Sequence, residues 1–335
     1  RHCDVSDHSR KREKRKESMK IAITCHYASL PEDHPTWQRA IQEAEVVLSD
    51  KVQLTSEELL DFVKDADALI SGTDFIREDV VRKLPEQLKV ISRPAVGYDR
   101  VDIKAARARG IDVCNAPGTN SNAVAELAFA LMLCCARQLP YHFENTKKCL
   151  WKNDKDGMEL TGKKLGILGL GAIGKELAKK ASAFGMEVLG YSRHLDTDFC
   201  KQYGIRPADR ETILRECDVI SLHMPLTPLT EEQINREAFK MMKKGVILIN
   251  TSRGKLVQRE DLIDAIHEEI IASYGTDVMK NEPPEQNDPL FSMEQVIITP
   301  HMGASTEEAH IKMMDVALTN ALDILEGKPC RNIVN

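Results

Sequence analysis

A glycine-rich segment in the middle of the chain constrains the fold more than any other feature. Residues 165–174 read LGILGLGAIG. Gly169, Gly171 and Gly174 form the pattern GxGxxG between an apolar, strand-like run and the helical stretch AIGKELAKKASAFG. The pattern is weak by itself, but between a strand and a helix it indicates a dinucleotide-binding site. The first glycine permits a tight turn, the second lets the backbone approach a pyrophosphate, and the third lets the helix pack closely on the strand.

Short apolar runs alternate with helical stretches on both sides of this segment. Three strand-like runs precede it, at residues 21–24, 68–71 and 89–92. Six more follow in order, at residues 164–168, 187–191, 218–223, 246–250, 273–277 and 296–299. This alternation is typical of an α/β fold with parallel sheets. Six strands with intervening helices are the size of a complete doubly wound nucleotide-binding sheet.

The length of 335 residues predicts two domains rather than one small core. A long apolar helix is expected to begin at Asn120 or Ser121, with Pro140 limiting its end. A last helix, at residues 307–325, is expected to pack back onto the first domain and make that domain discontinuous. We therefore predict two doubly wound, parallel-sheet α/β domains. They are a flavodoxin-like substrate domain at residues 19–117 and 302–335, and a Rossmann dinucleotide-binding domain at residues 118–301.

Charge and composition exclude several classes of protein. Residues 1–18 are rich in lysine and arginine and lack an apolar period, so we expect a disordered leader, with Met19 as the natural start. A basic run of this kind can also be a nuclear or nucleic-acid address, but the net charge of −6 argues against a nucleic-acid binder. No apolar run approaches the ~20 residues that span a bilayer, so no membrane partner is expected.

The nine cysteines include no CxxC pair and no spacing typical of a zinc site. We therefore expect no metal centre. Small buried thiols, rather than ligands or disulfides, are the expected role of these residues, which indicates a reducing, cytoplasmic setting.

The end of the second strand of the nucleotide domain bears on the choice of cofactor. An Asp or Glu about 20 residues after the glycines commonly binds the ribose hydroxyls. Here Ser192 stands at that position, Arg193 and His194 follow, and Asp196 lies too far along. Without the carboxylate nothing repels a 2′-phosphate, and Arg193 can pair with it, which favours NADP(H) over NAD(H). Alternatively, Arg193 only stacks on adenine and both cofactors are accepted.

Three reactive side chains follow late strands of the nucleotide domain. Arg253 comes after the apolar run VILINTS, Glu282 lies in the loop after GTDV, and His301 directly follows VIITP. Arginine is a permanently charged fork for a carboxylate, and histidine exchanges a proton near neutral pH. A carboxylate beside an imidazolium stabilises and orients it. Hydride transfer to a small 2-oxo acid needs these three groups, although Arg253 alone could also cap a turn.

Further contacts are expected from other strand ends. Asp277 ends a strand of the nucleotide domain and is placed to contact the nicotinamide side of the cofactor, or to cap the following turn. In the first domain, Val96 and Gly97 follow a strand in a segment that allows close approach to a substrate carboxylate. Thr73 lies at another strand end and is expected to line the same site.

These segments, in this order, resemble the D-isomer-specific 2-hydroxyacid dehydrogenase family, particularly its phosphoglycerate dehydrogenase and hydroxypyruvate/glyoxylate reductase branches. The resemblance covers most of residues 85–310. It runs through the segments VGYDRVDIKAARARGIDVCNAPGTNS, ELTGKKLGILGLGAIGKELA, HMPLTPLTEEQI, NTSRGKLV, TDVMKNEPP and HMGAS. It implies that Arg253, Glu282 and His301 are the catalytic residues. The cofactor contacts that it implies are Ala172, Ile173, Ser192, Met224, Thr251, Ser252, Asp277, Gly303 and Ala304. It also implies a homodimer formed through the nucleotide domain, which suits the apolar helix around residues 125–136.

The sequence departs from the family pattern in two places. Ser192 and Arg193 replace the acid of the NAD-using branches, and LISGTDF lacks the arginine that phosphoglycerate-binding members have there. The expected activity is reduction of hydroxypyruvate, glyoxylate or 3-phosphohydroxypyruvate, with phosphoglycerate dehydrogenase itself as the alternative. Formate oxidation is not expected, because formate-oxidising relatives have Gln in place of Glu282. A rival of another class is a nucleotide-sensing scaffold like the C-terminal-binding corepressors, which share the fold and the trio.

Overall fold

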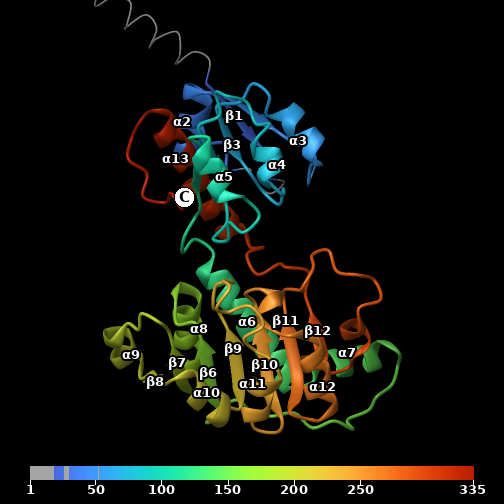
Figure 1. The fold of residues 1–335 in the computed structure, drawn as a ribbon. Helices are drawn as coiled ribbons and strands as arrows, with labels where there is room; N and C mark the ends of the chain where they lie inside the picture. Colours follow the sequence, from blue (N-terminus) through green and yellow to red (C-terminus); the bar gives the residue numbers. More distant parts are fainter. Residues whose placement is uncertain (1–18, 26–29, 52) are drawn as a thin grey trace, which may run out of the picture. The chain divides into compact units, whose positions relative to one another are not determined.

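The computed structural model describes residues 19–25, 30–51 and 53–335, which form two compact units (Figure 1). The first unit comprises the described residues up to Asn120 together with Thr306–Asn335, and the second comprises Ser121–Ser305. Both junctions lie close to the domain boundaries expected from the sequence. The basic leader at residues 1–18 lies outside the described residues.

The first unit is built on a parallel sheet of five strands in the order β2-β1-β3-β4-β5. This is the order of flavodoxin-like doubly wound folds, as predicted. The strands are β1 (Lys20–Ile23), β2 (Glu45–Leu48), β3 (Ala68–Ile70), β4 (Val90–Ser92) and β5 (Asp112–Cys114). The helices are α2 (Pro35–Glu43), α3 (Ser56–Phe62), α4 (Glu78–Val81), α5 (Ile103–Ala108) and α13 (Glu307–Leu325).

Helix α13 returns to this unit from the far end of the sequence. It begins at Thr306, whose hydroxyl accepts a hydrogen bond from the backbone N–H of Ala309, and acidic residues occupy its first turn. Its buried face packs into the core that contains β1, β3 and β4. The Ser92 hydroxyl also donates to the carbonyl of Ala317 at 2.8 Å. Burial of this apolar face therefore joins the two sequence segments of the unit.

The second unit contains a parallel sheet of seven strands in the order β12-β11-β10-β9-β6-β7-β8. With β6 as its first strand, this is the Rossmann order, extended by one strand. The strands are β6 (Lys164–Leu168), β7 (Glu187–Tyr191), β8 (Arg206–Pro207), β9 (Val219–Leu222), β10 (Val246–Asn250), β11 (Ile271–Thr276) and β12 (Val296–Ile298). The predicted fold class is confirmed, and the short β8 is added to the six strands expected.

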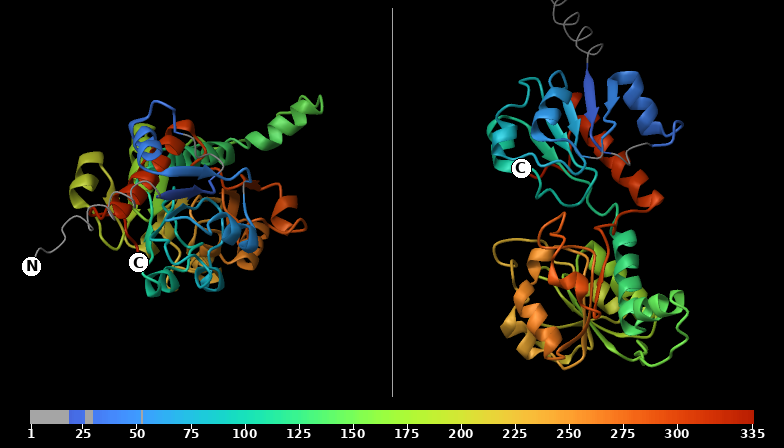
Figure 2. Two further views of the ribbon diagram at one scale, coloured as in Figure 1. Left: turned by 90° about the horizontal axis from the view of Figure 1, so that it is seen from above. Right: turned by 90° about the vertical axis from the view of Figure 1, so that its right-hand side faces the viewer.

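Seven helices of the second unit connect these strands or precede them. They are α6 (Ser121–Ala136), α7 (Leu139–Lys147), α8 (Ala172–Ala183), α9 (Thr197–Tyr203), α10 (Arg210–Glu216), α11 (Arg236–Met241) and α12 (Arg259–His267). Two short 3-10 turns cover Gly254–Leu256 and Pro289–Ser292. Figure 2 shows α7, in green, projecting away from the rest of its own unit.

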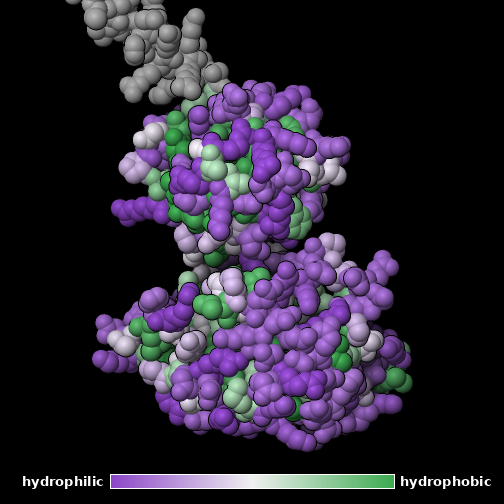
Figure 3. All heavy atoms as spheres, in the orientation of Figure 1, coloured by the Kyte–Doolittle hydropathy of each residue, from purple (hydrophilic) through white to green (hydrophobic). Residues whose placement is uncertain are grey.

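The apolar helix α6 lies inside the second unit. Its buried side chains share a core with α8, β6 and β10. It ends at Ala136, before Pro140, because Gln138 adopts a left-handed conformation and starts α7. Among the described residues, no single helix is both long and apolar enough to span a membrane. Only α6 and α7 taken together reach that length and hydropathy, and they are bent by 69° relative to each other. Hydrophilic side chains cover most of the face seen in Figure 3, with small hydrophobic patches between them.

Candidate active site

The glycine-rich turn joins β6 to α8, where the order of the second sheet reverses. Gly169 has a φ of 107°, and a Cβ there would lie 2.5 Å from the backbone carbon of His223. A Cβ on Gly174 would lie 2.3 Å from the carbonyl oxygen of Gly169. At Gly171, by contrast, a Cβ would meet nothing within 4 Å. The outer two glycines are thus required by packing, while Gly171 leaves the backbone open to a ligand.

Helix α8 presents its N-terminus at this turn. Gly171 is its N-cap and has no side chain to satisfy the first N–H groups, and no acidic residue occupies the first turn. The free N–H groups that begin with Ala172 and Ile173, and the helix dipole, favour an anion there. The backbone N–H groups of Gly169 and Leu170 both donate to the carbonyl of Tyr191 at 2.9 Å. The end of β7 therefore lies beside the turn, as a dinucleotide site requires.

The residues after β7 are Ser192, which is half-buried, and Arg193 and His194, which are exposed. The nearby carboxylate of Asp196 is already engaged. One oxygen accepts the N–H of Phe199 at 3.0 Å and caps α9, and the other contacts Lys175 Nζ at 2.6 Å. The Lys175 ammonium lowers the pKa of the Asp196 carboxyl. Asp196 is thus a structural residue here, in agreement with the expectation that it does not replace the missing acid.

The ends of β9 and β10 add a second group of polar atoms. Met224 is buried, and its carbonyl accepts the Ser252 hydroxyl at 2.5 Å. The Thr251 hydroxyl is also buried and has no hydrogen-bond partner within the described part of the chain. An unpaired buried hydroxyl is costly, so a ligand group that bonds to it would be stabilised. This atom and the open glycine turn fit a dinucleotide.

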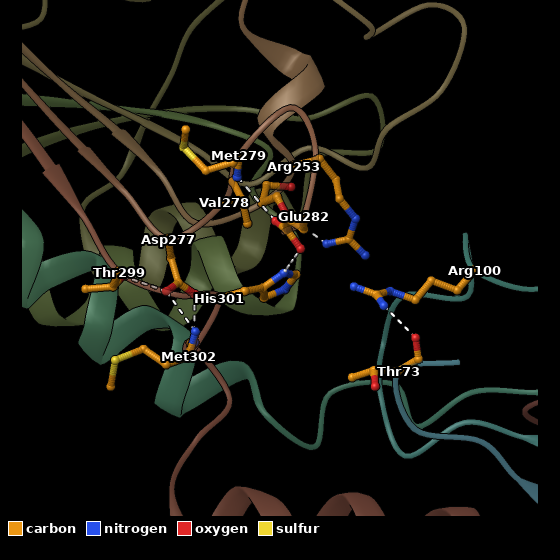
Figure 4. Close-up of polar contacts among 12 residues, drawn as sticks. Thr73, Arg100, Arg253, Asp277, Val278, Met279, Glu282, Thr299, His301 and Met302 are labelled. Carbon is orange, nitrogen blue, oxygen red and sulfur yellow. Dashed lines mark hydrogen bonds and ion pairs between the residues drawn. The ribbon is translucent and has the colours of Figure 1, made fainter. Parts of the chain in front are cut away.

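Asp277 holds the loop that carries His301. Its carboxylate is 2% exposed and accepts the Thr299 hydroxyl at 2.6 Å, the Met302 N–H at 2.8 Å and the Gly303 N–H at 2.7 Å (Figure 4). His301 itself has a φ of 52°, a left-handed conformation that costs about 1–2 kcal/mol in a residue with a Cβ. These three hydrogen bonds offset that cost. Asp277 therefore positions the loop, a role that its place in the sequence did not reveal.

The Arg–Glu–His trio comes from three adjacent strands. Arg253 follows β10, Glu282 follows β11 and His301 follows β12, and these strands pair in that order. His301 Nδ1 lies 2.6 Å from Glu282 Oε2. The second oxygen of Glu282 accepts the N–H of Met279 at 3.2 Å, and Figure 4 shows the imidazole and the carboxylate pointing toward each other. Because Nδ1 faces the carboxylate and 45% of the His301 side chain is exposed, Nε2 is left for proton exchange.

A close backbone contact joins the arginine loop to the glutamate loop. A Cβ on Gly254 would lie 2.2 Å from the backbone carbon of Met279, the residue whose N–H binds Glu282. On the other side, the Asn250 side chain donates to the Arg253 carbonyl at 2.9 Å. Arg253 is therefore held at a fixed place relative to the Glu282–His301 pair.

Substituting Gly254→Ala is expected to separate these two loops, because the new Cβ clashes with backbone rather than with a flexible side chain. For the 2-oxo acid expected from the sequence, kcat/KM should fall about a hundredfold, the usual effect of misplacing a reacting group by an ångström. Steady-state kinetics and thermal unfolding would be measured together. Gly245→Ala is a control for backbone strain away from the site: its φ of 83° disfavours alanine, but a Cβ there meets nothing within 4 Å. It should lower thermal stability without the kinetic loss, and equal kinetic losses in both variants would contradict this role of Gly254.

The expected substrate residues of the first unit follow neighbouring strands. Thr73 comes after β3, and Val96 and Gly97 come after β4, all partly buried. Two residues that the sequence did not single out organise them. Arg100 donates to the Thr73 carbonyl at 2.5 Å, and Asn115 donates to the Val96 carbonyl at 2.9 Å. Arg100 follows β4 and Asn115 follows β5, at the same sheet edge as Thr73 and Val96. This position at the strand ends is the sequence feature from which both residues could have been predicted.

His223 is a partly buried histidine beside the glycine-rich turn. Its Nε2 lies 2.8 Å from the Ser221 hydroxyl, and Nδ1 has no partner among the described residues. Burial lowers the pKa of His223 from 6.5 to about 4. The folded state therefore holds the neutral ring. No cluster of three or more His, Cys, Asp or Glu suited to a metal occurs within the described ranges.

The low pKa of His223 predicts acid sensitivity. The unfolded chain binds a proton near pH 6.5 while the folded chain does not, so stability is complete above pH 6.5 and falls as the pH drops toward 4. The difference is about 3 kcal/mol. Chemical denaturation of the wild type and His223→Gln across this pH range would measure it. A parallel pH dependence in both proteins would contradict the assignment.

Comparison with known proteins identifies relatives over most of the chain. Residues 129–303 match the model of the family described as D-isomer specific 2-hydroxyacid dehydrogenase, NAD binding domain. A D-3-phosphoglycerate dehydrogenase of Methanocaldococcus jannaschii is 42% identical over 84% of this chain and 54% of its own length. A glyoxylate reductase of Thermococcus litoralis is 40% identical over 83% of this chain and 86% of its own. The chain thus spans about half the length of that phosphoglycerate dehydrogenase.

A solved structure agrees with these sequence matches. The crystal structure of a protein from Thermus thermophilus is 36% identical, with a TM-score of 0.84 over 95% of this chain and 100% of its own. The structural similarity therefore extends over both units and is not limited to the nucleotide-binding unit.

Proposed function

Because the chain belongs to the D-isomer specific 2-hydroxyacid dehydrogenase family, whose NAD-binding domain it contains, we propose that it is a D-2-hydroxyacid dehydrogenase. It would interconvert a small 2-oxo acid and the corresponding 2-hydroxy acid with a nicotinamide dinucleotide. The observation that carries this proposal is the 2.6 Å contact between His301 Nδ1 and Glu282, next to the loop of Arg253.

Each member of the trio has a distinct chemical task in this proposal. When bound, the cofactor supplies the hydride to C2 of the oxo acid, or accepts it in the reverse direction. Arg253 holds the substrate carboxylate through its charged fork. His301 donates a proton from Nε2 to the carbonyl oxygen in reduction and removes it in oxidation. Glu282 holds Nδ1 and orients the ring.

The cofactor would be held by the turn and strand ends of the second unit. The glycine turn and the N-terminus of α8 receive the pyrophosphate. The proposed contacts are Gly169, Gly171, Ala172, Ile173, Gly174, Ser192, Arg193, His194, Met224, Thr251, Ser252, Asp277, Gly303 and Ala304. Thr73, Val96 and Gly97 remain the proposed substrate contacts of the first unit.

We propose NADP(H) as the preferred cofactor, with NAD(H) as the alternative. The exposed guanidinium of Arg193 follows β7 next to the glycine turn, while Asp196 is engaged with Lys175. Among the residues described at this strand end, no carboxylate is then free to repel a 2′-phosphate.

Arg193→Ala tests this preference. Loss of a charge-assisted contact with the 2′-phosphate is expected to raise the KM for NADPH about tenfold or more, with little change for NADH. The comparison of kcat/KM for the two cofactors in wild type and variant is the measurement. Arg215→Ala, which removes another exposed arginine of the same unit, is the control. Equal losses of kcat/KM with NADPH and NADH would show that Arg193 does not bind the 2′-phosphate.

The proposed substrates are hydroxypyruvate, glyoxylate and 3-phosphohydroxypyruvate. Two relatives carry the names glyoxylate reductase and hydroxypyruvate reductase. The 42% identity to a D-3-phosphoglycerate dehydrogenase supports that activity as the second candidate. A panel of 2-oxo acids, assayed with NADPH and NADH, separates these activities by kcat/KM. Tight cofactor binding without turnover of any acid would instead support a nucleotide-sensing scaffold.

A cytoplasmic homodimer is proposed as the working state. The described cysteines are free thiols, as in reducing compartments. Half of residues 125–136, the expected pairing surface, are buried inside the second unit. The partner would contact Phe129 and Leu133 of this helix and Phe184 after α8, which are partly exposed, together with Trp151, which is 94% exposed. Sedimentation of the full chain measures this state.

A further inference from the structure

Two cysteines lie next to each other in the first unit, far from the trio in the sequence. Cys114 ends β5 and is fully buried, whereas Cys330 follows α13 and is partly exposed. Their sulfur atoms are 3.7 Å apart. Backbone hydrogen bonds hold the segment around Cys330 beside β5: Val334 N–H donates to Val113 at 2.8 Å, and Asn115 N–H donates to Asn332 at 3.2 Å. The two thiols are thus kept close by the backbone on both sides.

The thiol pair belongs to a chain of amide hydrogen bonds. Cys330 Sγ donates to Asn320 Oδ1 at 3.4 Å. The other end of the Asn320 amide donates to the Asn115 carbonyl at 3.0 Å, in the buried interior. The Asn115 side chain in turn donates to the Val96 carbonyl at 2.9 Å. Hydrogen bonds through two asparagines therefore connect Cys330 to the loop proposed to bind substrate.

The two sulfurs differ in reactivity. Burial raises the pKa of the Cys114 thiol well above its usual range, so this residue is a poor first target for an oxidant. Cys330 is accessible to solvent at its position after α13. An accessible thiol with a second thiol beside it is the arrangement in which oxidation ends in a disulfide.

We propose that Cys114 and Cys330 form a reversible disulfide when the protein meets a peroxide. Cys330 sulfur attacks one oxygen of hydrogen peroxide, the O–O bond breaks, and a sulfenic acid and one water result. Cys114 sulfur then attacks the sulfenic sulfur, the S–O bond breaks, and the proton of the Cys114 thiol leaves with the hydroxide as a second water. The two thiols lose two electrons and two protons in total, and the peroxide is reduced to two waters. A dithiol reverses the bond by thiol–disulfide exchange.

The bond has consequences for both stability and the Val96 loop. The sulfurs must approach from 3.7 Å to about 2 Å, and Cys330 loses the thiol proton that it donates to Asn320. The crosslink also joins positions 216 residues apart, so the oxidised protein should unfold at a higher temperature. If the proposed function holds, the disturbed network raises the KM for the oxo acid about fivefold, the equivalent of one neutral hydrogen bond.

The full-length chain would be treated with hydrogen peroxide, alkylated, digested and analysed by mass spectrometry. The expected result is an intact mass lower by two hydrogen atoms and a crosslinked peptide pair containing Cys114 and Cys330, both reversed by dithiothreitol. Cys330→Ser should abolish the crosslink and the rise in unfolding temperature, while Cys149→Ser, which changes an exposed cysteine, should keep both.

Oxidation of Cys330 to a sulfinic acid without any link to Cys114 would overturn the proposal, as would crosslinks formed only between molecules. Because mass and unfolding temperature require no turnover, an inactive protein that still forms the bond would count against the proposed function alone. An active protein without the bond would count against the disulfide alone.

Discussion

Replacing His301 by alanine is expected to lower kcat for the oxo acid by about 10²–10⁴-fold, the usual contribution of a positioned proton donor. Cofactor affinity should stay nearly unchanged, because the proposed pyrophosphate site lies at the turn after β6, several strands away. The measurements are single-turnover reduction and cofactor titration by fluorescence.

The backbone of His301 requires a second variant, because its φ is 52°. Asparagine tolerates this left-handed conformation better than alanine does, so His301→Asn separates the loss of the proton donor from a change in the loop. Both variants should show the same loss of kcat. An active His301→Asn protein would contradict the assignment of the proton donor. Glu282→Gln is expected to lower activity less.

Arg253→Ala is expected to reduce kcat/KM for the oxo acid on the order of a thousandfold, because two charge-assisted hydrogen bonds to the substrate are lost. The variant retains the Arg253 carbonyl, which accepts the bond from Asn250. It loses the bond that Arg253 Nη1 donates to the Ser252 carbonyl at 2.8 Å, so a modest fall in thermal stability is expected. Steady-state kinetics with hydroxypyruvate, together with thermal unfolding, would check both expectations.

Arg253→Lys is the matched control that separates the geometry of the guanidinium group from its charge. Lysine keeps the charge but cannot make two parallel hydrogen bonds, so most of the loss, though not all of it, should persist. Full activity in Arg253→Lys would show that charge alone is sufficient. Full activity in Arg253→Ala would remove the arginine from the proposed mechanism.

The sequence was sufficient for the features that depend on local patterns. The glycine spacing and the apolar runs predicted the strand-turn-helix unit, and the order of the second sheet confirms it. The position of Arg253 and His301 directly after apolar runs predicted their place at strand ends. In parallel sheets these ends share one edge, so a linear pattern is enough to bring such residues together.

Other parts of the site depend on contacts between distant segments, which no local pattern encodes. The approach of Gly254 to Met279 follows from how two loops pack. The three hydrogen bonds to Asp277 come from a loop more than 20 residues later. The neighbourhood of Cys114 and Cys330 arises because α13 returns to the first unit. The two-residue β8 also escaped prediction, since it is too short for an apolar period.

Hydride transfer to C2 of a 2-oxo acid is the step on which the proposed function depends, and isotope transfer measures it directly. The wild-type chain would be incubated with hydroxypyruvate and a cofactor deuterated at its transferable position, and the product analysed by mass spectrometry and chiral chromatography. The expected product is D-glycerate with deuterium at C2, and His301→Ala should form no such product. A product without deuterium, or of L configuration, would contradict it.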